Sequence, residues 1–104
     1  MQQYKIDFKT MPWDTPAVGI RCKAHQREGR KLRLAEFTRE FVEPGWCTKG
    51  HIGYILAGKM EIDFGGKVVM FGAGDGLFIP AGQKDKHKAK ALTDTVQMIL
   101  VEDV

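Results

Sequence analysis

Cysteine is scarce in this 104-residue chain: Cys22 and Cys47 are the only two, and they form no CxxC pair. The N-terminus lacks the charged and then apolar segments of a secretory signal, and no apolar run reaches membrane-spanning length. A disulfide framework, secretion and a membrane partner are therefore all disfavoured. We expect a reduced, cytoplasmic protein.

Strong charge of one sign is also absent. The net charge is +3, and most of it comes from residues 23–33 and 84–90, where no aromatic residues alternate with the lysines and arginines as they do in single-strand binders. The sequence contains no Ser-His-Asp pattern, P-loop or dinucleotide fingerprint. Nucleic-acid binding and these common enzyme classes are not indicated.

Short apolar segments separated by turn residues are what the chain does contain. In the central stretch, residues 51–56 are apolar, β-branched and aromatic, residues 57–59 read Ala-Gly-Lys, and Met60, Ile62 and Phe64 alternate with acidic residues. This pattern predicts a β-hairpin with one buried face. His51 is the first residue of this predicted hairpin.

Further strands are predicted on both sides of this hairpin. They cover residues 18–22, 67–71, 77–79, 86–91 and 96–101, and a short alternating strand over residues 4–8 precedes a segment broken by Pro12 and Pro16. Eight or nine short strands without an internal repeat predict an all-β sandwich or barrel. Because the N-terminal strand has no sequence neighbour and an unpaired edge is a liability, we predict a homodimer.

Residues 31–43 are ambiguous on local grounds. The segment has no glycine or proline and is rich in helix formers, and Leu34, Phe37 and Phe41 lie at helical spacing. Strand periodicity fits as well, and the Pro44-Gly45 turn that follows leads directly into strand sequence. The residues alone leave helix and strand both open.

Two stretches resemble the cupin family. Residues 54–58, Tyr-Ile-Leu-Ala-Gly, match the end of its first motif, and residues 74–82, Gly-Asp-Gly-Leu-Phe-Ile-Pro-Ala-Gly, match the start of its second. The resemblance implies a small single-domain cupin over residues 1–104: an N-terminal segment, 1–17, and a double-stranded β-helix, or jelly-roll barrel, over about 18–104. It also implies that residues 31–43 form a long strand.

The cupin metal motif is degenerate in this sequence. With Gly58 at the motif's last glycine, His51 occupies the position of the metal-binding glutamate, and the paired histidines are missing. In the second motif Asp85 stands where the family has histidine, and His87 follows two residues later. Lysines at 86, 88 and 90 must face solvent, so alternation directs His87 inward.

The candidate site follows from these positions. His51 and His87, with Cys47 or Glu36, suit a divalent transition metal such as Zn, Fe, Ni, Mn or Cu. The alternative is two inward histidines satisfied by hydrogen bonds or water, with Cys47 as a small apolar residue. Trp46 and Tyr54 are candidates to line a ligand pocket, and fit a core or a subunit interface equally well.

Three functions remain open at this point. The first is a domain that binds or senses a small molecule in a pocket lined by His51 and His87. The second is a metal-dependent enzyme of the dioxygenase, isomerase or decarboxylase type, in which the histidines hold the metal. The third is a purely structural role, in which the barrel is an inert core of a protein whose function is assembly.

Overall fold

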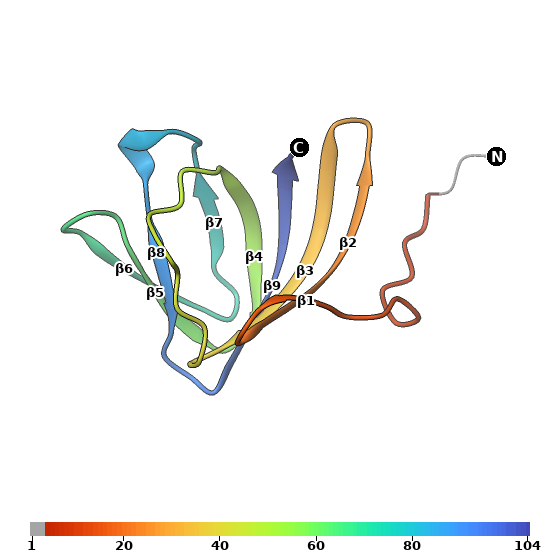
Figure 1. Cartoon of the computed structure of the whole chain (residues 1–104), viewed down its shortest axis with the longest axis horizontal. Helices are drawn as coiled ribbons and strands as arrows, with labels where there is room; N and C mark the ends of the chain where they lie inside the picture. Colours follow the sequence, from red (N-terminus) through yellow and green to blue (C-terminus); the bar gives the residue numbers. More distant parts are fainter. Residues whose placement is uncertain (1–3) are drawn as a thin grey trace.

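The computed structural model describes residues 4–104, and nearly every regular element in it is a β-strand (Figure 1). The nine strands are β1 Asp14–Ala17, β2 Ile20–Arg27, β3 Arg30–Thr38, β4 His51–Ala57, β5 Lys59–Asp63, β6 Val68–Gly72, β7 Gly76–Ile79, β8 Lys88–Ala91 and β9 Thr95–Asp103. One 3₁₀ turn, Gln83–Asp85, is the only helical segment among residues 4–104, so no described helix is long enough to cross a membrane. The all-β prediction is confirmed.

Two antiparallel sheets face each other, as a jelly roll requires. The larger sheet has the order β1-β2-β3-β9-β4-β7 and the smaller one β6-β5-β8. In Figure 1 the sheets meet at the lower end and diverge toward the upper end. The core between them includes Ile55, Met60 and Val96, which are the largest fully buried side chains.

Residues 30–38 form a strand despite their helix formers. All nine residues of β3 have partners on β9, from Arg30 opposite Asp103 to Thr38 opposite Thr95. This pairing and the burial of Ala35 and Phe37 outweigh the local preference. Residues 39–43 lie beyond the strand, so the expected element is confirmed but ends earlier.

The predicted central hairpin is wrong. β4 pairs with β7 and β9, whereas β5 pairs with β6 and β8, so the two consecutive strands belong to different sheets. Gly58 makes this corner with a φ of 85°, and a Cβ there would overlap the carbonyl oxygen of Thr95. The Ala-Gly-Lys connector is thus a corner of the barrel.

The predicted N-terminal strand is also wrong. Residues 4–13 contain no strand, because the backbone N–H of Lys9 donates to the Asp7 carboxylate and the chain turns there. The first strand is instead β1, on the proline-containing segment, paired with β2. Pro16 is tolerated since β1 lies at the edge of the sheet, where a missing N–H costs no ladder bond.

Candidate functional site

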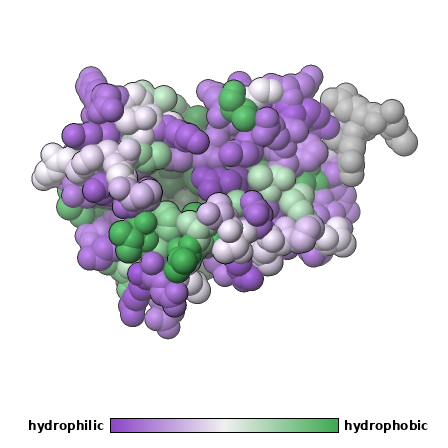
Figure 2. Space-filling model, viewed as in Figure 1, coloured by the Kyte–Doolittle hydropathy of each residue, from purple (hydrophilic) through white to green (hydrophobic). Residues whose placement is uncertain are grey.

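A cavity of about 950 Å³ lies between the two sheets. Figure 2 shows the surface hollowed between them. Most of the wall is apolar and comes from inward positions on both sheets, including Phe37, Met60, Ile62, Leu77 and Leu100. One part of the wall is polar, and Cys47, His51, His87 and Glu102 lie there.

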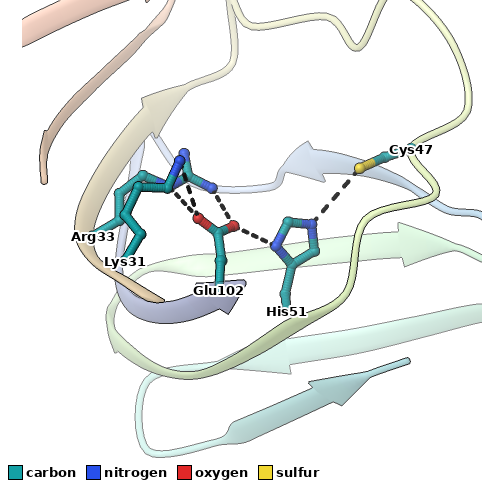
Figure 3. Close-up of polar contacts among 5 residues, drawn as sticks. All are labelled: Lys31, Arg33, Cys47, His51 and Glu102. Carbon is teal, nitrogen blue, oxygen red and sulfur yellow. Dashed lines mark hydrogen bonds and ion pairs between the residues drawn. The ribbon is translucent and has the colours of Figure 1, made fainter. Parts of the chain in front are cut away.

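His51 begins β4, and strand alternation turns it toward the cavity together with Gly53 and Ile55. Its Nδ1 lies 2.6 Å from Oε2 of Glu102. Because an ionised carboxylate only accepts, we assign the proton to Nδ1, which leaves the Nε2 lone pair free. Nε2 lies 3.7 Å from Sγ of Cys47. Figure 3 marks this contact with a dashed line.

His87, which lies just before β8, is also held through its Nδ1. It is 3% exposed, and its Nδ1 lies 3.0 Å from the carbonyl oxygen of Asp85, which only accepts. The proton therefore lies on Nδ1, and Nε2 carries the lone pair here too. The two imidazole rings are 5.2 Å apart between centroids, at an interplanar angle of 78°.

Cys47 contacts both histidines, His51 through its side chain and His87 through its backbone. Its backbone N–H donates to the carbonyl of His87 and its carbonyl accepts from the N–H of His87, both at 2.9 Å. This isolated β-bridge fixes the loop before β4 against the start of β8. Ligand atoms of Cys47, His51 and His87 consequently all lie within 4.8 Å of one another.

Glu102 organises the polar wall electrostatically. Arg33 donates to it through Nε at 2.9 Å and Nη2 at 2.7 Å, and Lys31 Nζ lies 3.8 Å away (Figure 3). Burial alone raises the pKa of Glu102, but the hydrogen bonds from His51 and Arg33 outweigh it and lower the pKa to about 2. Glu102 is therefore a carboxylate at neutral pH.

The structure brings together some of the expected site residues and leaves others apart. His87 faces inward as alternation predicted, and it meets His51 and Cys47. Glu36 lies on the outer face of β3, where it accepts from Arg21 at 2.8 Å. Trp46 and Tyr54 are 40% and 48% exposed and are not among the residues that line the cavity.

Trp46 has a different environment from the one expected. The ammonium groups of Lys86 and Lys88 lie 4.9 Å and 4.8 Å from its ring centre. Such cation–π contacts are worth about 0.5–1 kcal/mol at an exposed site. Trp46 therefore packs outside the cavity, on the side of the 3₁₀ turn and β8.

Glu102 and Arg33 were not identified from the sequence. A signal for Glu102 exists: Val96, Met98 and Leu100 alternate inward, and the next position of that parity is Glu102. An inward acid at the end of an apolar strand requires a buried partner. The identity of that partner depends on the β3–β9 register, which the sequence does not specify.

Comparison with known proteins agrees with the fold described above. KdgF from Halomonas sp. superposes with a TM-score of 0.79 at 21% identity, over 99% of this chain and 96% of that one. An RmlC-like cupin from Shewanella frigidimarina gives 0.75 at 11% identity, over 98% and 91%. A transcriptional regulator of the HTH_3 family from Vibrio cholerae gives 0.64 at 11%, over 84% and 52%.

At these identities the structural matches show a shared fold alone. No curated protein matches the chain significantly. The model of the cupin domain, however, matches residues 43–102, which contain both motif-like stretches and the three clustered side chains. The chain belongs to the cupin family.

Proposed function

We propose that this cupin binds a divalent transition metal through Cys47, His51 and His87 and holds a small molecule in the adjoining cavity, as a binding or sensing domain. The observation that carries the proposal is the convergence of three ligand atoms within 4.8 Å. They come from the start of β4, the residue just before β8 and the loop between β3 and β4, so the folded barrel itself assembles them.

The donor atoms of Cys47, His51 and His87 are suitable ligands for a metal ion. Each histidine engages Nδ1 with an acceptor, Glu102 in one case and the Asp85 carbonyl in the other, and this directs Nε2 to the cluster. Such outer contacts fix the tautomer and orientation of metal-binding histidines. One sulfur and two imidazole nitrogens suit Zn, Cu, Fe or Ni better than Mn.

The cavity supports binding of a small molecule beside the metal. Its volume of about 950 Å³ is within the range of small-molecule sites, and its walls are mainly apolar. Three protein ligands leave a tetrahedral metal one position free. A fitting ligand therefore has an apolar body and one oxygen, nitrogen or sulfur donor.

A metal-dependent enzyme is the second candidate, and the same free position favours it. A metal bound there would act as a Lewis acid on an oxygen of the substrate. In this candidate Glu102 keeps His51 oriented and Arg33 keeps Glu102 charged.

Recovery of a bound compound unchanged after incubation supports binding, whereas its conversion supports the enzyme. The third candidate, a purely structural role in assembly, requires neither a metal nor a ligand.

Metal content of the protein purified without a histidine tag tests the proposal. We expect about one metal ion per chain, and a rise in the free energy of unfolding of about 2.7 kcal/mol at roughly 100 times the Kd. The His51→Ala, His87→Ala double variant should lose both effects. His25→Ala is the matched control, since His25 lies on β2 and is absent from the cluster. Equal responses from wild type and the double variant would refute the site.

A further inference from the structure

Two basic side chains, Lys31 and Arg33, belong to the wall of the cavity. Ala35 and Phe37, the next positions of the same parity on β3, are buried between the sheets, so alternation directs Lys31 and Arg33 to the inner face as well. All four residues line the cavity. In Figure 1 the Lys31 end of β3 lies where the two sheets diverge. The two cations are therefore at the open end of the cavity.

Most other charges of the wall are engaged elsewhere. The charged residues of the described chain that line the cavity are Arg30, Lys31, Arg33, Lys49, Glu43, Glu102 and Asp103. Arg30 and Asp103 are directly opposed on β3 and β9 and are both exposed, so they offset each other at the rim. Glu43 lies against the smaller sheet, where it accepts from the backbone N–H of Ala89 at 3.3 Å. Among these acids, Glu102 is the one that contacts Lys31 and Arg33.

Glu102 cannot neutralise both cations. It accepts two hydrogen bonds from Arg33, whereas Nζ of Lys31 lies 3.8 Å from its Oε1, which is too long for a hydrogen bond. Glu102 occupies two of the five N–H donors of Arg33, and the Cys22 thiol beside the guanidinium is a weak partner. Two cations and one carboxylate leave one positive charge in a mainly apolar wall. A further negative charge would be stabilised there.

The proposed metal would add to this charge. A divalent ion held by the Cys47 thiolate and two neutral imidazoles keeps one net positive charge. Figure 3 shows Lys31 and Arg33 on one side of Glu102, and His51 and Cys47 on the other. The polar wall therefore attracts anions with the metal or without it.

We propose that the cavity binds organic acids, with the carboxylate of the ligand held by Lys31 and Arg33. The inference rests on the small-molecule cavity of the proposed function and not on its metal. Ammonium and guanidinium groups form charge-assisted hydrogen bonds to carboxylates that are about twice as strong as neutral ones. Ala35, Phe37 and Leu100 follow directly inside the two cations on β3 and β9, and they accommodate the apolar body of the acid.

A carboxylate fits this position better than a phosphate. A phosphate monoester carries about 1.5 to 2 negative charges at pH 7, whereas the wall near Lys31 and Arg33 has one uncompensated positive charge. Phosphate sites also use the backbone N–H groups of a helix N-terminus. Within residues 4–104 the only helical segment is the three-residue 3₁₀ turn, Gln83–Asp85. A singly charged acid is therefore the matching ligand.

Calorimetric titration of the zinc-loaded protein with phenylbutanoate, phenylbutanol and phenylbutylamine tests the inference, because these probes share an apolar body and differ in the end group. We expect the acid to bind at least about 10-fold more tightly than the alcohol, and the amine to bind most weakly. High salt should reduce the preference for the acid.

Lys31→Met should remove most of this preference and leave binding of the alcohol unchanged. The variant should fold, since Arg33 keeps both hydrogen bonds to Glu102. Lys31→Glu, which reverses the charge, should bind the acid more weakly than the alcohol. Lys90→Met is the matched control, because Lys90 is 71% exposed, pairs with Glu61 and does not line the cavity. It should behave like wild type.

Zinc content and a titration of the metal-free protein separate this inference from the metal site. A preference for the acid that survives removal of zinc and is lost in Lys31→Met supports the carboxylate site, whatever the fate of the metal proposal. The inference is overturned if wild type binds none of the three probes or binds the acid no more tightly than the alcohol. It is also overturned if folded Lys31→Met and Lys31→Glu keep the full preference. In these cases a bound zinc would still support the metal site.

Discussion

The carboxylate of Glu102 lies 2.6 Å from Nδ1 of His51, and this contact joins the end of β9 to the start of β4. Arg33 on β3 holds the same carboxylate through two hydrogen bonds. The Glu102 side chain is only 7% exposed, so these partners offset the cost of burying its charge. One acid thereby orients a histidine and connects three adjacent strands.

Replacing Glu102 should lower both stability and metal affinity. In Glu102→Gln the Arg33 guanidinium loses its buried counterion, which we expect to cost about 3 kcal/mol of unfolding free energy. Looser orientation of His51 should weaken metal binding about 10-fold to 100-fold. Urea denaturation and metal titration measure the two effects.

The matched control for this change is Glu36→Gln. Glu36 pairs with Arg21, but on the outer face, where the Arg21 side chain is 46% exposed. Exposed pairs contribute about 0–1 kcal/mol, so this variant should remain close to wild type in both assays. Equal losses in the two variants would contradict the central role of Glu102.

Acid should remove the contribution of Glu102. Its pKa falls from the ordinary 4.5 to about 2 on folding, so the unfolded chain takes up the proton first as the pH drops. The stabilisation is present above about pH 4.5 and is lost progressively between about pH 4.5 and pH 2. The difference in unfolding free energy between wild type and Glu102→Gln should therefore shrink across this window. A difference that stays constant down to pH 2 would show that the carboxylate is not held in its charged form.

The corner at Gly58 should tolerate no side chain. Gly58→Ala combines a positive φ with overlap between the new Cβ and the Thr95 carbonyl oxygen. Gly29 also has a positive φ, of 77°, but nothing lies within 4 Å of a Cβ there. Thermal unfolding should show Gly58→Ala about 1–3 kcal/mol less stable than Gly29→Ala, which carries the backbone strain without the overlap. Equal losses would mean that the corner can relax around the methyl group.

Strand positions were largely predictable because alternation is a local property. The lysines at 86, 88 and 90 were sufficient to place His87 inside. Pairing was less predictable: β4 and β5 have the pattern of a hairpin, and the positive φ at Gly58 fits a tight turn as well as a corner. Only the contacts with β9 and β8 decide which sheet each strand joins.

The candidate site was predictable in its histidines and not in its supporting residues. His51 and His87 were identified from the motif-like stretches and alternation, and Cys47 from its position near the missing ligands. The proton positions on both rings depend on Glu102 and Asp85, which contact them through tertiary register and turn geometry. For residues 4–8 alternation failed, because Asp7 forms a local turn that competes with extended structure.

Cobalt(II) titration tests the central claim most directly, since a thiolate ligand gives cobalt an intense charge-transfer absorption that nitrogen and oxygen ligands do not. We predict this band for wild type, with saturation at one cobalt per chain, and its retention in Cys22→Ser, because Cys22 is buried on β2 outside the cluster. Cys47→Ser should abolish the band, and His51→Ala or His87→Ala should weaken cobalt binding. A wild-type protein without the band, or a band that persists in Cys47→Ser, would contradict a metal centre built from Cys47, His51 and His87.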